Sequence, residues 1–442
     1  MKFETSFSSA EKMYPLDDPW YERLKEIAPF HGLLSGDKET RKIQKGAFLS
    51  GETENPTLDY PNLEKFGLAK RERALLKLKG EISQNETNDT LRKTYLWKVN
   101  EKLAEIRMLK ASQSGDDRRF LKYSKFIYGE PSKDVYEYSI SQLKKIIDDK
   151  LHDNNPGISQ AAQRLNAELS DALIENETSI NPQEFNFPEA KSTENEAQYS
   201  AEDIKLAFEE ALKKSGVESW AVVVDTKSSD TGLSSSQKTK TEIIPHTRKI
   251  KDTRLKALIE HEMTHVLRRE KGERSRLKLL GLGLDRYLPG EEGLTSYKEQ
   301  QVEGARDFSG FENHLAISLA LGLDGKKRDF RGVFNIMKDY YFINSSEKDS
   351  KEALESAANS AWDKCARIFE GTTCQTPGVC RTREIVYREG NIGIWNLVKN
   401  NSDEVRRFSV GKYDPTNPRH IWILDQLGIN DDDLERLEKK SQ

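Results

Sequence analysis

The chain is poor in cysteine and histidine. Its 442 residues include three cysteines, Cys365, Cys374 and Cys380, and seven histidines. An odd and sparse set of cysteines argues against a disulfide framework and fits a reducing compartment. The spacing of Cys374 and Cys380, with no second pair, is also unsuited to a zinc knuckle. We therefore expect a cytoplasmic protein.

Long apolar runs and an excess of one charge are lacking as well. The longest apolar run, LAISLALGL at 315–323, is too short to span a bilayer, and the N-terminal MKFETSFSSAEKMYP has no signal-peptide core. The 70 basic and 74 acidic residues leave a net charge of −4, so we expect no nucleic acid and no membrane as partners. The 17 Phe, 15 Tyr and 6 Trp residues can close an apolar core, which indicates a folded protein.

Helical periodicity dominates the first part of the chain. Residues 1–60 show no sustained period and are predicted to be irregular, apart from a short helix at 21–27. Between 65 and 110, two stretches with apolar residues three and four apart flank the turn-like QNETNDT, which predicts a helical hairpin. This hairpin has 12 basic and 6 acidic residues, so it is either a solvated surface or a binding surface for an acidic protein partner. Further helices are predicted at 135–151 and 158–176.

The texture changes after a Pro-, Asn- and Glu-rich segment at 177–199, which we interpret as a boundary. The predicted organisation is an irregular segment at 1–60, a helical region at 61–190 and a second domain at 200–442. In that domain WAVVVD at 220–225 and KTEIIP at 240–245 predict strands, joined by a polar linker that suits a hairpin. Helices are predicted at 201–215, at 252–270 with Asp252 or Thr253 as its cap, and at 291–304, 311–322, 331–341 and 350–369, with late strands at Glu384–Tyr387 and Arg407–Val410. The predicted fold class is therefore α+β, mostly helical with a small β-sheet.

The stretch ALIEHEMTHVLRREKG at 257–272 carries the pattern His-Glu-x-x-His. His261 and His265 are four residues apart, so on a helix their rings project from one face and can share a tetrahedral zinc ion. Glu262, beside the first histidine, is placed to act as a general base. The alternative is a solvated surface helix that matches by chance. Two of only seven histidines take this spacing, however, and the helix follows a β-rich segment, so we predict a zinc site.

Two histidines rarely hold a catalytic zinc ion, so a third ligand is required. The segment PGEEGLTSYKEQQVEG at 289–304 offers Glu291, Glu292 and Glu299 on a predicted helix. The residue pattern by itself does not choose among these three glutamates.

Several motifs resemble those of a known family. HEMTHVLR followed by LPGEEGLTSY resembles the HEIGTH…QEGLA signature. That signature is found in the flavohemoglobin-expression-modulating QEGLA-motif proteins of bacteria and in the microtubule-associated tyrosine carboxypeptidases of eukaryotes. Flanking segments resemble theirs in the same order: NDTLRKTYLWKV through YGEP, then FEGTT with GVCRTREIVYREGNIGIWNLV, then VGKYDPTNPRHIWILDQLGI. The resemblance covers roughly residues 60–430.

This resemblance implies a zinc metallopeptidase domain that binds one zinc ion per chain. It assigns His261, His265 and Glu292 as zinc ligands and Glu262 as the catalytic base. The expected reaction is hydrolysis of the last peptide bond at the C-terminus of a peptide or protein, with release of an aromatic residue, Tyr or Phe.

The chain departs from the family signature in one respect. The family places three residues between the glutamate and the second histidine, whereas only Met263 and Thr264 intervene here. Residues five apart project about 140° apart on a regular helix, whereas residues four apart share a face. The shorter spacing therefore allows zinc binding without a distorted helix. In addition, Glu291 and Thr295 stand where the signature has glutamine and alanine.

A carboxypeptidase also needs a cation for the carboxylate of its substrate, ideally an arginine. The segment CRTREIVYREG offers Arg381, Arg383 and Arg388, and the zinc helix offers Arg268 and Arg269. We prefer Arg383, because it falls where the family segment carries a basic residue, and we include Arg381 as a second substrate-binding candidate.

Two tyrosines are candidates for stabilising the oxyanion. They are Tyr297 and Tyr387, and Tyr387 is also predicted to bind substrate. His246 and His314 are interpreted as structural residues. Two alternatives to the carboxypeptidase remain: a non-catalytic or regulatory member of the family, and another zinc hydrolase such as an aminopeptidase.

Overall fold

The computed structural model describes residues 15–27, 30, 32–170, 178–191, 196–226, 232–236, 239–345 and 350–430. These residues are mostly helical, with two small sheets, which confirms the predicted α+β class. No helix in these ranges is long and apolar enough to cross a membrane.

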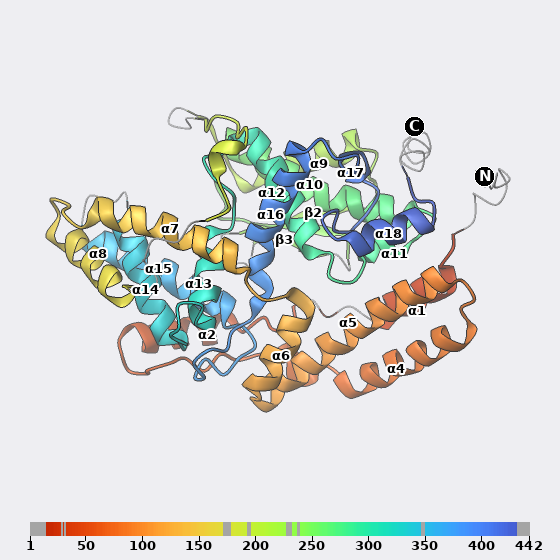
Figure 1. The fold of residues 1–442 in the computed structure, drawn as a ribbon, viewed down its shortest axis with the longest axis horizontal. Helices are drawn as coiled ribbons and strands as arrows, with labels where there is room; N and C mark the ends of the chain where they lie inside the picture. Colours follow the sequence, from red (N-terminus) through yellow and green to blue (C-terminus); the bar gives the residue numbers. More distant parts are fainter. Residues whose placement is uncertain are drawn as a thin grey trace.

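The predicted helical hairpin is present and forms the lower right of Figure 1. Its helices are α4 (Leu68–Asn85) and α5 (Asp89–Ser114), and the Asn88 side chain caps α5 by accepting a hydrogen bond from the Leu91 amide. The apolar face of the hairpin packs against α1 (Asp18–Ile27), which agrees with the short helix expected at 21–27. The other helices before residue 130 are α2 (Lys38–Leu49), α3 (Pro61–Lys65) and α6 (Asp117–Tyr128).

Many basic residues of the hairpin are paired within it. Arg107 and Lys110 both contact Glu72, and Lys98 lies 2.6 Å from Glu101. Much of the positive charge is therefore neutralised locally. An acidic partner for this surface stays a prediction.

Helix α2 was missed by the sequence analysis, which predicted irregular structure across residues 1–60. It begins after Asp37, whose side chain accepts a hydrogen bond from the Thr40 amide, and its main buried residue is Phe48. The Phe48 ring lies 5.0 Å from Phe330 and 5.2 Å from Trp362, centroid to centroid. One aromatic anchor, docked on distant helices, stabilises this helix, and such a contact leaves no local signal in the sequence.

The largest apolar cluster joins helices from both sides of the predicted boundary at 177–199. Before it come α7 (Lys133–Lys150) and α8 (Pro156–Glu168), and after it come α13 (Phe311–Leu321), α14 (Phe330–Ile343) and α15 (Ser350–Ile368). These five helices lie together at the left of Figure 1. The helix expected at 158–176 ends at Glu168, and residues 171–177 lie outside the described part.

The strands at 220–225 and 240–245 are present, but the predicted hairpin between them is wrong. Strands β2 (Ala221–Asp225) and β4 (Thr241–Pro245) pair in parallel, and β3 (Ser234–Ser236), within the linker, pairs antiparallel on the other side of β4. A linker of this length can return to the start of the sheet, which a two-residue turn cannot do. A second sheet pairs β1 (Gln198–Tyr199) with β5 (Ile250–Lys251), and α9 (Ala201–Lys214) packs on β2 and β4.

Helix α10 (Asp252–Arg274) follows β5 directly. The prediction that Asp252 or Thr253 caps this helix is wrong. The cap position is Lys251, whose side chain makes no capping hydrogen bond. Glu196, from the segment before β1, accepts a hydrogen bond of 3.0 Å from the Thr253 amide. An amide at the start of α10 thus donates to a carboxylate from another segment, which also suits the positive end of the helix dipole.

The late strands predicted at Glu384–Tyr387 and Arg407–Val410 are wrong. The first region is a 3₁₀ turn, η3 (Thr382–Glu384), that runs into α16 (Ile385–Lys399), and the second begins at the last residue of α17 (Glu404–Arg407) and continues as a turn. Ile385 and Val386 favour a strand locally, but both are buried at the start of a long helix. The chain then reaches α18 (Pro418–Gln426).

Helices α12 (Leu288–Glu303) and α16 approach each other closely, beside α10 (Figure 1). A Cβ atom placed on Gly293 would lie 2.3 Å from the backbone carbonyl of Gly390. A Cβ atom on Gly390 would lie 1.9 Å from the carbonyl oxygen of Pro289. Backbone therefore meets backbone at this crossing, which explains the glycine in the Glu-Gly-Leu motif and sets the position of Glu292.

Candidate metal centre

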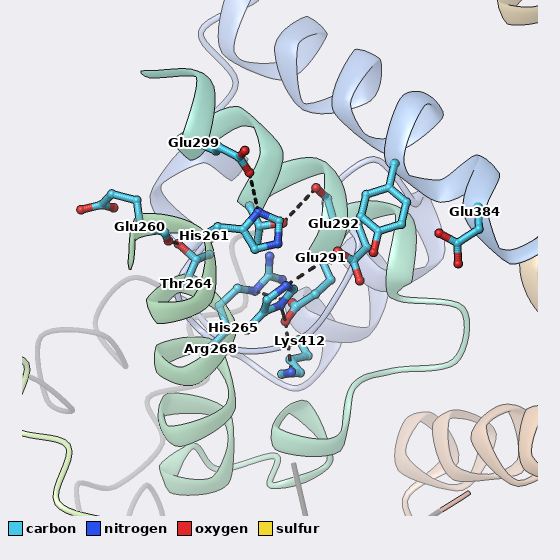
Figure 2. Close-up of polar contacts among 12 residues, drawn as sticks. Glu260, His261, Thr264, His265, Arg268, Glu291, Glu292, Glu299, Glu384 and Lys412 are labelled. Atoms are coloured by element: carbon cyan, nitrogen blue, oxygen red, sulfur yellow. Dashed lines mark hydrogen bonds and ion pairs between the residues drawn. The ribbon is translucent and has the colours of Figure 1, made fainter. Parts of the chain in front are cut away.

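The two histidines of the motif project side by side from α10. The helix is continuous from Asp252 to Arg274, so His261 and His265 lie one turn apart. Their ring centroids are 5.1 Å apart and the ring planes are inclined by 69°. Figure 2 shows both rings facing α12.

Glu292, on α12, completes the group. One ligand atom each from His261, His265 and Glu292 can be chosen so that all lie within 4.8 Å of one another. The Nε2 atom of His265 is 3.7 Å from Oε2 of Glu292. In the described ranges no other three His, Cys, Asp or Glu side chains converge in this way.

The other two candidate glutamates contact the Nδ1 atoms of the histidines. Glu299 accepts a hydrogen bond of 2.8 Å from Nδ1 of His261, and Glu291 accepts one of 2.8 Å from Nδ1 of His265 (Figure 2). With Nδ1 engaged as a donor, Nε2 of each ring keeps its lone pair for a metal ion. The three glutamates thus have different positions. Glu292 lies near Nε2 of His265, whereas Glu291 and Glu299 accept hydrogen bonds from the Nδ1 atoms. This donor set fits a zinc ion.

Glu291 is a buried carboxylate between two cations. Arg268 Nε lies 3.2 Å from Oε2, and Lys412 Nζ lies 3.1 Å from Oε1. Burial alone would raise the pKa of Glu291, but Lys412, Arg268 and the hydrogen bond from His265 hold it well below its ordinary value. Lys412 was not identified from the sequence, because it is remote along the chain and belongs to no local pattern with the histidines.

Glu299 has a more exposed counter-ion. Arg254, on the first turn of α10, pairs with Glu299 and lies 3.1 Å from Glu303, and its side chain is 40% exposed. Burial opposes protonation of His261, but the bond to Glu299 and the carboxylates of Glu262 and Glu292 raise its pKa. Surroundings that favour a proton on His261 in this way also favour a metal cation.

A second carboxylate lies near the candidate base. Glu262 is half-buried on α10, and Glu242, on β4, is only 1% exposed. Ser235 donates a hydrogen bond of 2.8 Å to Glu242, while burial and the charge of Glu262 raise the pKa of Glu242 to about 8. Glu242 was not identified from the sequence, although the alternation that buries Ile244 in the same strand also places Glu242 on the inner face.

A cavity of about 690 Å³ adjoins Lys412, the partner of Glu291, although His261, Glu262, His265 and Glu292 do not line it. Lys412, Arg383 and Tyr287 line it near α12, and Lys98 and Lys102 line it on α5. In all, eight Lys or Arg residues and four Glu residues contribute to its wall. The cavity is therefore suited to a ligand with negative charge.

Among the candidate arginines that line the cavity, Arg383 has the longest ion-pair contact. Its side chain is 32% exposed, and its Nη1 atom lies 3.3 Å from Oε1 of the neighbouring Glu384. Arg381 also lines the cavity but pairs with Glu370. Arg388 is fully buried and donates to the carbonyl of Phe308, so it belongs to the core.

The remaining candidates from the sequence have structural positions. Arg268 donates to the carbonyl oxygens of Gly411 at 2.9 Å and Tyr413 at 2.7 Å, and Arg269 pairs with Glu273. Tyr297 packs against Trp395, with ring centroids 4.8 Å apart. Burial, and after it the nearby charge of Glu292, raise the pKa of Tyr387. His314 is buried against Glu389, and His246 is exposed in the turn after β4, so neither joins the cluster.

Comparisons with curated proteins and with solved structures gave no significant match. A family model described as microtubule-associated tyrosine carboxypeptidase matches residues 141–431. The matched range contains the histidine pair, Glu292, Arg383 and Lys412, whereas the hairpin at 65–110 lies outside it. Membership of this family indicates a peptidase that acts at a C-terminus. Since the match covers more than half of the chain and agrees with the resemblance of its motifs, the protein belongs to the microtubule-associated tyrosine carboxypeptidase family.

Proposed function

We propose that this protein is a zinc-dependent carboxypeptidase that releases an aromatic residue, Tyr or Phe, from the C-terminus of a peptide or protein. The observation that carries the proposal is the convergence of His261, His265 and Glu292, with Nδ1 of each histidine already bonded to a carboxylate. Such carboxylate–histidine pairs are the usual surroundings of a protein-bound zinc ion.

The chemistry divides between the metal and the chain. When bound, zinc polarises the scissile carbonyl and makes water a stronger nucleophile at neutral pH. Glu262, next to His261 on α10, accepts a proton from the attacking water and passes it to the leaving amine. A Glu242 that keeps its own proton at neutral pH adds no second negative charge beside Glu262.

Substrate binding is assigned to the cavity. Arg383 offers a guanidinium that can bind the terminal carboxylate in a bidentate manner, and Tyr387 lies on the following helical turn. Leu288, Ile127 and Met108 provide apolar wall for an aromatic side chain. Arg381 is a second, already paired cation.

The cationic cavity also favours a carboxypeptidase over an aminopeptidase. A free N-terminus is positively charged and would meet eight Lys or Arg residues against four Glu residues on the cavity wall. A non-catalytic family member would not need to retain all of His261, Glu262, His265 and Glu292, which are present together.

The test uses peptides that end in Tyr or Phe, each with a free and with an amidated C-terminus. We expect cleavage of the free forms only, and about one zinc ion per chain by metal analysis. Glu262→Gln should retain zinc and lose activity, whereas the control Glu260→Gln, at an exposed position on the same helix, should retain both. Equal cleavage of amidated peptides, or turnover by Glu262→Gln, would contradict the proposal.

A further inference from the structure

The hydrogen bonds that His261 and His265 donate from Nδ1 have the same length, but the carboxylates that accept them have different surroundings. At His265 the carboxylate of Glu291 is 2% exposed, and its two cations, Arg268 and Lys412, are 1% and 6% exposed. At His261 the carboxylate of Glu299 is 17% exposed, and its partner Arg254 is 40% exposed. One support is therefore inside the protein and the other is at its surface.

The inner support is also part of the fold. Arg268 donates to Gly411 and Tyr413, and the backbone of Lys412 donates to the carbonyl of Leu280 at 2.7 Å. Glu291 thus connects α10 and α12 to the segment that precedes α18. Removing its charge leaves two buried cations without their counter-ion, which is costly in a protein interior.

The outer support makes no such connection. Arg254 lies on the same helix as His261, and Glu299 and Glu303 lie on one face of α12. Ion pairs at this exposure contribute little to stability. The contact that remains specific is the bond from His261 to Glu299, because it sets the direction of the ring.

We propose that Glu291 and Glu299 are positioning residues that direct Nε2 of His265 and His261 toward Glu292, and that only the Glu291 support is also required for the fold. This inference rests on the proposed function in so far as the site holds zinc. It assigns to Glu299 an effect on metal affinity alone, and to Glu291 an effect on both metal affinity and the stability of the metal-free protein.

The experiment measures zinc affinity of the full chain by competition with a chromophoric chelator. Glu299→Ala should weaken zinc binding about 10- to 100-fold, as loss of such carboxylates typically does. The matched control is Glu303→Ala, which removes a carboxylate from the same helix and the same arginine but touches no histidine. It should change the affinity by less than about threefold. With Co²⁺ in place of zinc, the visible absorption bands should shift for Glu299→Ala and not for Glu303→Ala.

Thermal unfolding of the metal-free proteins tests the second half of the proposal. Glu299→Ala should have the same melting temperature as the wild-type protein, and Glu291→Ala should have a lower melting temperature or fail to fold. Equal loss of zinc affinity in Glu299→Ala and Glu303→Ala would overturn the positioning role, because a general charge effect would then account for both. An unchanged melting temperature for Glu291→Ala would overturn its role in the fold. Failure of the wild-type chain to bind zinc would instead contradict the proposed function itself.

Discussion

Replacing Gly293 by alanine should separate α12 from α16 and move Glu292 away from the histidines. Alanine in a helix interior gains about 1 kcal/mol over glycine from propensity. Against this, the new Cβ would lie 2.3 Å from the carbonyl carbon and oxygen of Gly390 and 2.9 Å from the amide of Asn391. These are backbone atoms, so no side chain can rotate away. The helices must separate by about 1 Å to reach ordinary contact, at a typical cost of about 1–3 kcal/mol or more.

The cost therefore equals or exceeds the gain, and the variant should be less stable by up to about 2 kcal/mol. A displacement near 1 Å also exceeds the tolerance of roughly 0.5 Å for a functional site, so zinc affinity should fall as well. Urea unfolding of the metal-free protein and chelator competition measure the two effects.

The control is Gly80→Ala in α4. Gly80 is exposed, and a Cβ atom there meets nothing within 4 Å. This variant should gain about 0.5–1 kcal/mol and bind zinc as the wild type does. If Gly293→Ala were as stable as Gly80→Ala and bound zinc normally, the close crossing of α12 and α16 would not be what places Glu292.

Three further outcomes are expected. Because the pKa of Glu242 is raised to about 8, the folded state binds more protons than the unfolded state between pH 4.5 and 8, and wild-type stability falls across this window. Glu242→Gln should therefore have wild-type stability near pH 4 and exceed it by up to about 5 kcal/mol above pH 8. The prediction is refuted if the urea midpoint of the variant differs from that of wild type by the same amount at pH 5 and at pH 8.5. Arg388→Met should lose about 1–3 kcal/mol, since it removes a buried donor to Asp307 and to the Phe308 carbonyl, and a loss below about 0.5 kcal/mol would show that the pair is not needed. Arg383→Ala should raise KM for free peptides far more than it lowers kcat, and unchanged KM would exclude it as the carboxylate site.

Local sequence rules predicted the elements that depend on local periodicity. The hairpin of α4 and α5 has long apolar repeats and a turn-like linker, and the β-branched runs became β2 and β4. The same rules failed where one distant contact decides the structure. Phe48 stabilises α2 by docking on α14 and α15, and Ile385 and Val386 are buried within a helix despite their preference for strands.

The candidate site shows the same division. The spacing of His261 and His265 was sufficient to place both rings on one helix face, because side-chain direction within a helix is a local property. Three glutamates on α12 were equally plausible as the third ligand, since the choice depends on how α12 is rotated and docked against α10. That docking is set by the glycine contact with α16, which pairs residues far apart in the chain.

The sequence by itself determined the chemistry of this protein: a His-Glu-x-x-His helix, a glutamate-rich segment after it, and the motifs of a carboxypeptidase family. The family resemblance pointed to Glu292, but only the tertiary structure showed that Glu292 converges with the histidines, that Glu291 and Glu299 accept hydrogen bonds from them, and that Lys412 and Glu242 lie at the same centre. The physical reason is that ligand type is a property of single residues. Convergence, burial and charge balance arise only when separate helices and strands pack together.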